Sequence, residues 1–452
     1  MATLTAPITG GVHGWPFAAS LVELSAAGYA EVEYFIDGTA VTYRPMGDLD
    51  MDGRWEVDEA GEIPFTTRLL VRRPVDQQRF NGTVLMSWIN VSAGFDIIGL
   101  DSPEILEGGF VVAAVSAQTV GIQGYDAQDP KGLSVWDPER YGALSIPSDD
   151  ASYDVFTEAA RLVGPNRPGN QVDPLAGLSV ERIVAIGGSQ SAARLHTYLN
   201  AVQPRERIFD GFLLDSHFGS GAPISTDGAG RPSGLSPGAM MRHPSRLRTD
   251  LGIPVMVVNT ESETLGYFPQ RQPDTDAFRL WEAAGTSHAT NSRVELEAKE
   301  KREWGTVHPL PEFGFRPNAL DVTPLRDAAV HSLHRWLIEG TPPPIMPPIV
   351  VTGEPPAIQR DNHGIAQGGI RLPAVEVPTA SLRGASDDGD MVVGLLGSCL
   401  PFDAETLRAL YPDHEAYVAA FDAAARHGVE AGFLLARDAD RLIGEANAAD
   451  IP

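Results

Sequence analysis

Short, nearly continuous apolar runs alternate with segments of helical composition over residues 82–340. The runs lie at residues 82–90, 109–118, 182–189, 209–216, 253–261 and 278–285. Helical segments are expected at residues 151–163, 191–202 and 324–340. Strands that are apolar on both faces are typical of a parallel sheet covered by helices. The sequence therefore predicts an α/β fold with a mostly parallel central sheet and helices on both faces.

The remaining segments follow other patterns. Residues 29–44 alternate like antiparallel strands around Asp37-Gly38, a recognised hairpin signal, and another strand is expected from Thr66. Residues 217–250 and 290–317 break the alternation, and we expect them to form inserted cap or lid loops. Residues 341–452 begin with a proline-rich stretch and end in an acidic helical tail. One domain spanning residues 1–452 is expected, with this extension packed on its core.

Composition excludes several classes of function. Asp and Glu total 60 against 34 Lys and Arg, so the net charge of −26 disfavours nucleic acid and anionic membranes as partners. Cys399 is the single cysteine, which rules out an intrachain disulfide. The beginning of the chain lacks the pattern of a secretory signal, and no apolar run reaches the roughly 20 residues of a membrane span. A cytoplasmic, soluble protein is expected, whereas its oligomeric state stays open.

Two serines lie in patterns related to the esterase motif G-x-S-x-G. The literal copy, GLSPG at residues 234–238, has no strand before Ser236 and no helix after it, and Pro237 has no N–H to donate. The stretch GGSQSA at residues 187–192 follows an apolar run and opens a helical segment. A nucleophilic serine needs such a strand-to-helix turn with small flanking residues. We therefore expect Ser189 to be the nucleophile.

Candidate partners of Ser189 follow it in the chain. His288 comes directly after an apolar run and a Gly-Thr-Ser turn, where a general base is expected. A carboxylate must orient its ring. Glu263 is the preferred candidate, Glu261 is the alternative, and Asp215 is a third possibility.

The oxyanion of the tetrahedral intermediate needs N–H donors. The N–H of Gln190, next to the nucleophile, is the expected first donor. The loop after residues 82–90 is expected to supply the second from Ser92, with Val91 next. The sequence contains no HExxH motif, no Walker A motif and no Gly-rich dinucleotide loop, so neither metal nor cofactor is expected. Met240, Met241, Trp304 and Phe313 could line an apolar substrate pocket or form the core of the cap.

Several of these motifs together resemble one family. They are WINVSAGFD, VWDPERYGAL, SYDVFTEAARLV, GGSQSA, NTESE, AGTSHA and GGIRLPAVEVPTA. Across nearly the whole chain they resemble the alpha/beta hydrolase domain-containing family of bacterial serine hydrolases. The resemblance implies one large hydrolase domain with inserted cap segments, and a triad of Ser189, His288 and either Glu263 or Glu261. The acid loop of that family often ends in Asp where this chain has Glu263, so the choice of glutamate stays open.

The expected function is hydrolysis of a small-molecule carboxylic ester or lactone through an acyl-enzyme, without a cofactor. One alternative is transfer of the same acyl group to an alcohol or amine. The other is a binding protein on a hydrolase scaffold without catalysis. The identity of the ester cannot be deduced from these motifs.

Overall fold

The computed structural model describes residues 2–125, 131–169, 172–225, 243–306, 315–385 and 391–451. The chain divides into two compact units, Met1–Val255 and Met256–Pro452. The boundary falls at the first residue of strand β10 (Val255–Thr260).

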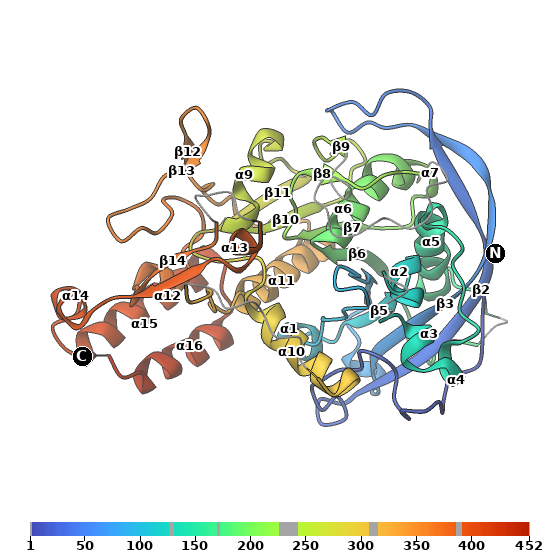
Figure 1. Ribbon diagram of the computed structural model, residues 1–452, viewed down its shortest axis with the longest axis horizontal. Coiled ribbons are helices and arrows are strands. Elements are labelled where there is room, and N and C mark those ends of the chain that lie inside the picture. The colour runs from blue at the N-terminus through green and yellow to red at the C-terminus, as the bar shows by residue number, and fades with distance from the viewer. Residues whose placement is uncertain are drawn as a thin grey trace. The chain divides into compact units, whose positions relative to one another are not determined.

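The first unit is built on a sheet whose strand order is β1-β2-β3-β5-β4-β6-β7. Neighbours from β1 through β5 pair antiparallel, whereas β5, β4, β6 and β7 run parallel. The strands are β1 (Thr3–Leu4), β2 (Tyr29–Pro45), β3 (Val57–Pro74), β4 (Thr83–Trp88), β5 (Val111–Val115), β6 (Arg182–Gly188) and β7 (Gly211–Asp215). Figure 1 shows the long β2 and β3 in blue beside the shorter parallel strands.

The parallel strands are those that the apolar runs predicted. Every residue of β4 and β5 is buried, as continuous apolar composition requires. Helix α5 (Ser152–Val163) contacts β4 and β5, and helix α6 (Gln190–Thr197) contacts β6 and β7. Aromatic side chains on the two helical segments meet directly, since the rings of Phe156 and Tyr198 lie 5.6 Å apart. The alternation of strand and helix is thus confirmed in this unit.

The hairpin predicted at Asp37-Gly38 is wrong. Both residues lie inside the continuous strand β2, which pairs with β3 along its whole length, with Gly38 opposite Phe65. A Cβ atom at Gly38 would lie 3.0 Å from the Phe65 ring and 3.0 Å from the Ala2 Cβ. Glycine therefore serves close packing here rather than a turn, a use that the dipeptide alone cannot distinguish.

Short helices and strands complete the first unit. They are η1 (Gln77–Arg79), α1 (Pro103–Glu107), α2 (Thr119–Gln123), α3 (Leu133–Trp136), α4 (Pro138–Tyr141), η2 (Asp149–Ala151), η3 (Tyr198–Val202), α7 (Gln203–Glu206), β8 (Ser220–Gly221) and β9 (His243–Pro244).

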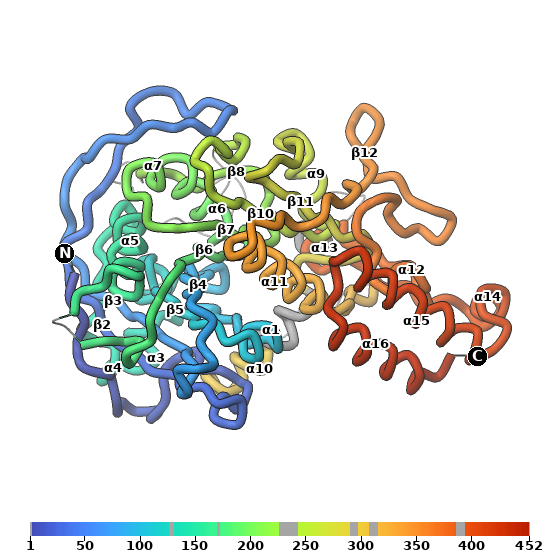
Figure 2. The backbone as a smooth tube through the Cα atoms, turned by 180° about the vertical axis from the view of Figure 1, so that it is seen from behind, coloured from blue at the N-terminus to red at the C-terminus, as the bar shows by residue number. Residues whose placement is uncertain are grey.

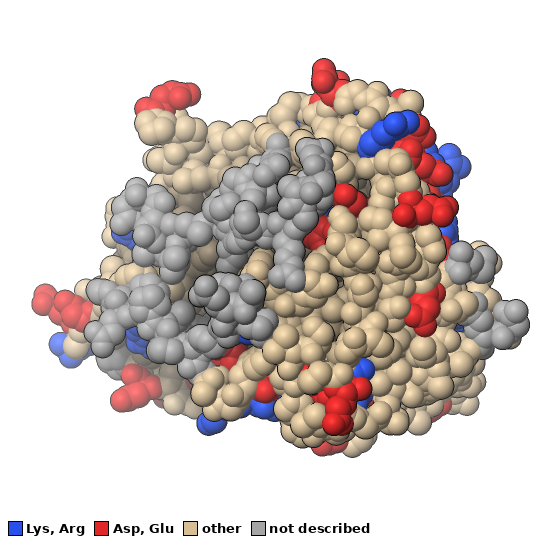
Figure 3. Space-filling model, turned by 45° about the vertical axis from the view of Figure 1, so that its right-hand side comes forward, with Lys and Arg blue, Asp and Glu red and all other residues tan. Residues whose placement is uncertain are grey.

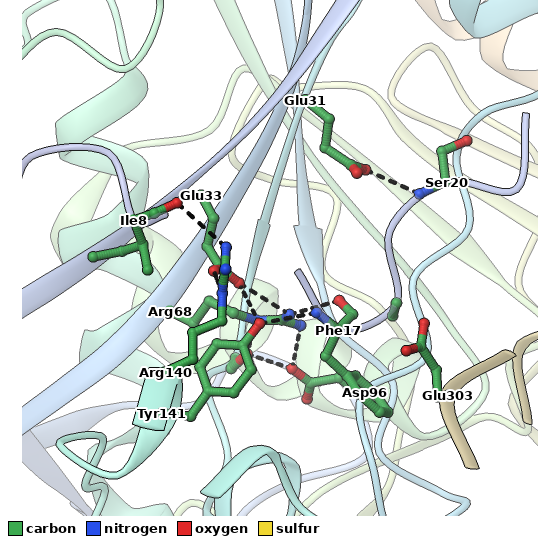
Figure 4. Close-up of polar contacts among 12 residues, drawn as sticks. Ile8, Phe17, Ser20, Glu31, Glu33, Arg68, Asp96, Arg140, Tyr141 and Glu303 are labelled. Atoms are coloured by element: carbon green, nitrogen blue, oxygen red, sulfur yellow. Dashed lines mark hydrogen bonds and ion pairs between the residues drawn. The ribbon is translucent and has the colours of Figure 1, made fainter. Parts of the chain in front are cut away.

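A buried ionic cluster joins strands β2 and β3 of this unit to helix α4 and to the loop after β4 (Figure 4). The Arg68 guanidinium on β3 lies 2.6 Å from Asp96 and 3.4 Å from Glu33 on β2, and all three side chains are fully buried. Arg140 Nε donates to Glu33 at 2.6 Å, and the Tyr141 hydroxyl donates to the same carboxylate at 2.8 Å. Asp96 lies in the loop between β4 and the next helix, so the cluster holds that loop against the sheet.

The second unit contains neighbouring strands β10 and β11 (Phe278–Ala283), with short helices between them in sequence and further helices after β11. The elements after β10 are η4 (Glu261–Glu263), α9 (Thr264–Tyr267), η5 (Phe268–Gln270), α10 (Thr290–Trp304), α11 (Thr323–Glu339), β12 (Val351–Thr352), β13 (Ala357–Ile358), α12 (Pro373–Glu376), β14 (Ala380–Arg383), α13 (Met391–Leu396) and β15 (Ser398–Pro401).

Helix α10 corrects one expectation about the cap segments. Residues 290–317 were expected to lack regular structure, yet Thr290–Trp304 is helical. Its sequence is rich in Glu, Lys and Arg, which are good helix formers, but it has almost no apolar periodicity. Helix propensity therefore indicates this helix, whereas apolar periodicity does not.

The acidic tail folds as predicted into helices, namely α14 (Ala404–Leu410), α15 (His414–Ala431) and α16 (Ala436–Ala448). Figure 2 shows α15 and α16 as adjacent helices in red. The side chains of this region share a small apolar core, which consists of Val377, Tyr411, Tyr417, Phe421 and Ala446.

Several sequence-based expectations lie outside the described residues. Ser236, Met240, Met241 and Phe313 belong to that group. The single domain with cap segments and a packed extension stays a prediction. Among the described residues, none of the helices combines the length and apolarity needed to cross a bilayer. Acidic side chains are scattered over the face shown in Figure 3.

Two buried histidines in the first unit form a hydrogen-bonded pair. His196 on α6 places its Nδ1 2.9 Å from His217 Nε2, and its Nε2 lies 2.7 Å from Ser245 Oγ. Burial lowers the pKa of His217 to about 3. Burial, together with the neighbouring His217 and His243, lowers the pKa of His196 well below its ordinary value. Both rings are therefore neutral in the folded protein at pH 7.

We predict that this pair destabilises the protein in acid. In the unfolded chain histidine has a pKa of about 6.5, so between that pH and about 3 the unfolded state binds more protons. The stability that comes from keeping these rings neutral is fully present above pH 6.5. Below this pH the free energy of unfolding falls by up to about 1.4 kcal/mol per pH unit for each ring. His217→Gln should flatten the decline of the melting temperature between pH 7 and pH 4.5. The exposed His427→Gln is the control, and equal slopes for both variants would contradict the prediction.

Candidate active site

Ser189 lies at a sharp turn between strand β6 and helix α6. The strand ends at Gly188, the helix begins at Gln190, and Ser189 between them has φ 59° and ψ −117°. This conformation is rare for a residue with a side chain and is usually held in place by its surroundings. The Ser189 N–H donates to the Asp215 carbonyl at 2.9 Å, which fixes the turn against the end of β7. The strand-to-helix turn expected at Ser189 is thus present.

The residues that flank Ser189 close the turn. A Cβ atom at Gly187 would lie 3.1 Å from Leu195 and 3.2 Å from the Ser191 backbone, so a larger residue would force these neighbours to move by a few tenths of an ångström. The Ser191 hydroxyl donates to the Gly188 carbonyl at 2.8 Å and accepts from the Gly188 N–H at 3.2 Å. Sequence reasoning treated Ser191 only as a small residue, whereas the structure gives its hydroxyl two hydrogen bonds to the turn.

A buried polar network lies next to the turn. Gln190 Nε2 donates to Gln118 Oε1 at 2.9 Å, and the Trp88 indole N–H donates to the same oxygen at 3.0 Å. Gln118 in turn donates to Asp149 at 3.3 Å, and Asp149 accepts from Arg194 on α6 at 2.8 Å. These contacts fix the first turn of α6 and leave the Gln190 backbone N–H, which has no acceptor within the helix, at the position next to Ser189.

The loop after β4 contains the two candidates for the second oxyanion donor. The Ser92 N–H donates to Asn90 Oδ1 at 2.8 Å, so it already has an acceptor. The Val91 N–H makes no backbone hydrogen bond among the described residues. Asn90 Nδ2 donates to the Gly188 carbonyl at 3.0 Å and so ties this loop to the turn that holds Ser189. Of the two donors named from the sequence, Val91 is the one left available.

His288 and Glu263 meet in the second unit. His288 Nδ1 lies 2.7 Å from Glu263 Oε1. The other oxygen of Glu263 accepts from both the N–H and the hydroxyl of Thr260, at 2.7 Å each. Glu263 is fully buried, whereas the His288 side chain stays 14 % exposed. Three donors therefore hold this carboxylate, and it fixes the orientation of the imidazole ring.

Glu261 lies only two residues away but has different partners. Its Oε1 accepts from Arg360 at 2.9 Å, and its Oε2 accepts from the Gly285 N–H at 2.8 Å. Its own N–H donates to the Thr286 carbonyl at 3.1 Å. Glu261 therefore connects the loop after β10 with the loop that leads to His288.

Ser262 adds a further contact between these two loops, because its hydroxyl accepts from the His288 N–H at 3.0 Å. Asp215, the third acid named from the sequence, lies in the first unit at the end of β7. Trp304 ends helix α10 and is partly buried. Across the described ranges, no group of three or more His, Cys, Asp or Glu residues is arranged to hold a metal ion.

Sequence reasoning gave no hydrogen-bonding role to four polar residues of this region, which are Asn90, Gln118, Ser191 and Thr260. Each acts through hydrogen bonds to backbone or side-chain atoms of the loops described above. Thr260 alone had a local signal, since Thr followed three residues later by Glu is a capping-box pattern.

A mostly parallel sheet with a serine at a strand-to-helix turn defines the class of α/β hydrolases. The family model described as "Alpha/beta hydrolase domain" matches residues 4–444. The chain belongs to this family, and the predicted fold class is confirmed.

Solved structures of several esterases resemble parts of the chain. Esterase Est22 is 12% identical over 53% of this chain and 64% of that one, with a TM-score of 0.27. This chain thus spans less than two thirds of Est22. Brefeldin A esterase, a bacterial homologue of human hormone-sensitive lipase, is 12% identical over 56% and 67% of the two chains, with a TM-score of 0.27.

Glucuronoyl esterase from Solibacter usitatus is 12% identical over 68% of this chain and 86% of that one, with a TM-score of 0.28. No curated protein matches the chain significantly. Family membership therefore rests on the match along residues 4–444.

We predict that Glu261→Gln lowers stability. If the glutamine oxygen accepts from Gly285, its NH₂ group faces Arg360 and leaves this mostly buried guanidinium without its carboxylate. Breaking such a pair costs about 3 kcal/mol, so the melting temperature should fall by several degrees. The control is Glu376→Gln, which removes an exposed carboxylate 2.7 Å from Arg371 and should change little. Equal melting temperatures for the two variants would show that Glu261 does not stabilise these loops.

Proposed function

We propose that this hydrolase cleaves small carboxylic esters through an acyl-enzyme on Ser189. The observation that carries the proposal is the backbone of Ser189, at φ 59° and ψ −117° between a buried strand and a helix. Such strain costs about 1–3 kcal/mol and persists where the surroundings over-determine it, often at functional sites. In α/β hydrolases this turn exposes the nucleophilic hydroxyl at the edge of the sheet.

In the proposed first step, Ser189 Oγ attacks the ester carbonyl carbon while His288 Nε2 accepts the hydroxyl proton. Glu263 Oε1, 2.7 Å from Nδ1, holds the proton on Nδ1 and stabilises the imidazolium that forms. The tetrahedral intermediate collapses when His288 returns the proton to the leaving oxygen. The alcohol departs, and the acyl group remains on Ser189.

In the second step, water attacks the acyl-enzyme with His288 again as general base. Collapse of the second tetrahedral intermediate releases the carboxylic acid and restores the Ser189 hydroxyl. The reaction adds one water molecule across the ester bond and needs no metal or cofactor.

The proposed oxyanion donors are the backbone N–H groups of Gln190 and Val91. Gln190 begins α6, so its N–H has no acceptor within the helix. Val91 takes the place that the sequence first gave to Ser92, because the Ser92 N–H already donates to Asn90. Removing one such donor typically costs about 10²- to 10³-fold in kcat.

We predict that Ser189→Ala abolishes hydrolysis of p-nitrophenyl acetate and labelling by a fluorophosphonate probe, because the nucleophile is lost. The melting temperature should stay close to that of the wild type. The matched control is Ser236→Ala, in the GLSPG motif, which should keep both activities. If Ser236→Ala lost labelling and Ser189→Ala kept it, the nucleophile would be Ser236 and the proposal would be wrong.

We predict that Glu263→Gln lowers kcat at least about 10²-fold with little change in KM. The Thr260 N–H can only donate, so the glutamine oxygen turns toward Thr260 and its NH₂ group faces His288 Nδ1. Nδ1 must then accept, which places the ring proton on Nε2, where the base has to be free. Glu261→Gln should lose less than about tenfold when assayed below its melting temperature. If Glu261→Gln lost more kcat than Glu263→Gln, Glu261 would be the acid that orients His288.

A further inference from the structure

We infer that Asn90 is a positioning residue that sets the second oxyanion donor against the nucleophile. The inference rests on the proposed function. Asn90 follows β4 at the start of the loop that carries Val91, and its side chain makes one hydrogen bond within this loop and one to the turn of Ser189. The same amide therefore connects both halves of the proposed oxyanion hole in the first unit.

The orientation of the Asn90 amide is fixed by its two partners. The Gly188 carbonyl, 3.0 Å from Nδ2, can only accept a hydrogen bond. The Ser92 N–H, 2.8 Å from Oδ1, can only donate one. An aspartate cannot donate to Gly188 when ionised, and an apolar residue can make neither contact.

The peptide between Gly188 and Ser189 is fixed at both of its polar atoms. Its carbonyl accepts from Asn90 Nδ2 at 3.0 Å and from Ser191 Oγ at 2.8 Å. Its N–H, on Ser189, donates to the Asp215 carbonyl at 2.9 Å. Asn90 thus helps to hold the unusual backbone of Ser189 as well as its own loop.

Other contacts close the loop at its far end. The Ile97 N–H donates to the Asn90 carbonyl at 2.8 Å. Asp96 is held by Arg68 at 2.6 Å and by the Ser116 hydroxyl at 2.5 Å. The end near Asp96 is therefore anchored to the sheet, and Asn90 is the side chain that anchors the end near Val91 to the turn of Ser189. Catalytic groups act fully only when held within about 0.5 Å of their productive geometry.

The chain contains a matched control at the other end of the same strand. Asn81 precedes β4, accepts from the Thr83 N–H at 2.9 Å and donates to the Gly108 carbonyl at 2.8 Å. Asn81 and Asn90 thus make the same pair of bonds, to the N–H two residues on and to a glycine carbonyl. They differ in location, because only Asn90 contacts the turn that holds Ser189.

The experiment compares Asn90→Asp and Asn81→Asp for hydrolysis of p-nitrophenyl acetate at pH 8. We expect both variants to fold by circular dichroism and to lose similar amounts of thermal stability. Asn90→Asp should lose about 10²-fold in kcat with KM within about threefold, the size of effect seen when one oxyanion donor is lost. Asn81→Asp should keep kcat within about threefold of the wild type.

The pH profile separates positioning from general loss of structure. A protonated aspartate can donate to Gly188 as the asparagine does, and with an ordinary pKa of about 3.9 roughly a tenth is protonated at pH 5. The kcat of Asn90→Asp relative to wild type should therefore rise about tenfold from pH 8 to pH 5. Asn90→Ala should show the same loss of kcat at pH 8 without this recovery at pH 5. If Asn90→Asp fails to fold, the loss of kcat in Asn90→Ala is the measurement that tests the inference.

The possible results lead to different conclusions. An active wild type together with Asn90 variants of unchanged kcat overturns the inference alone. An equal loss in Asn81→Asp does the same, because the effect is then general strain. A wild type that neither hydrolyses the ester nor reacts with a fluorophosphonate at Ser189 overturns the proposed function, and this inference with it.

Discussion

The backbone of Ser189 is the constraint on which the first unit depends. A side chain at φ 59° needs neighbours that hold it, and these neighbours come from the turn itself and from two distant loops. Gly187 lets α6 approach the strand, Asp215 accepts the Ser189 N–H, and Asn90 and Ser191 hold the preceding carbonyl. The parallel order β4-β6-β7 brings these groups together, because the carboxyl ends of parallel strands lie at one edge of the sheet.

The second unit uses a similar principle with different groups. Glu261 and Glu263 lie on one short 3₁₀ turn, yet one binds Arg360 and the other His288. Each carboxylate uses both of its oxygens, so neither is free to exchange partners without losing buried hydrogen bonds. In the proposed reaction, the pre-formed Glu263–His288 pair needs little reorganisation when the imidazole becomes charged.

The sequence was sufficient for features that depend on local periodicity. Continuous apolar runs located β4, β5, β6, β7, β10 and β11, and the change to helical composition located the turn at Ser189. It failed where one pattern has two physical causes, as at Gly38, where close packing has the same signature as a turn. It also could not find Asn90 or Gln118, because their partners lie 98 and 72 residues away. The preference for Glu263 over Glu261 rested on its spacing after the strand, and Glu263 is the glutamate that contacts His288.

The buried ionic cluster also limits how this chain can change over evolution. Charges alternate along it, from Arg140 to Glu33 to Arg68 to Asp96, and its net charge is zero. Neutralising a single member leaves an uncompensated charge without water, whereas replacing a cation and its adjacent anion together keeps the balance. These four positions are therefore epistatic, and a homologue that lacks one member should lack its neighbour as well. Covariation at these sites would record electrostatic balance in the interior rather than selection on substrate.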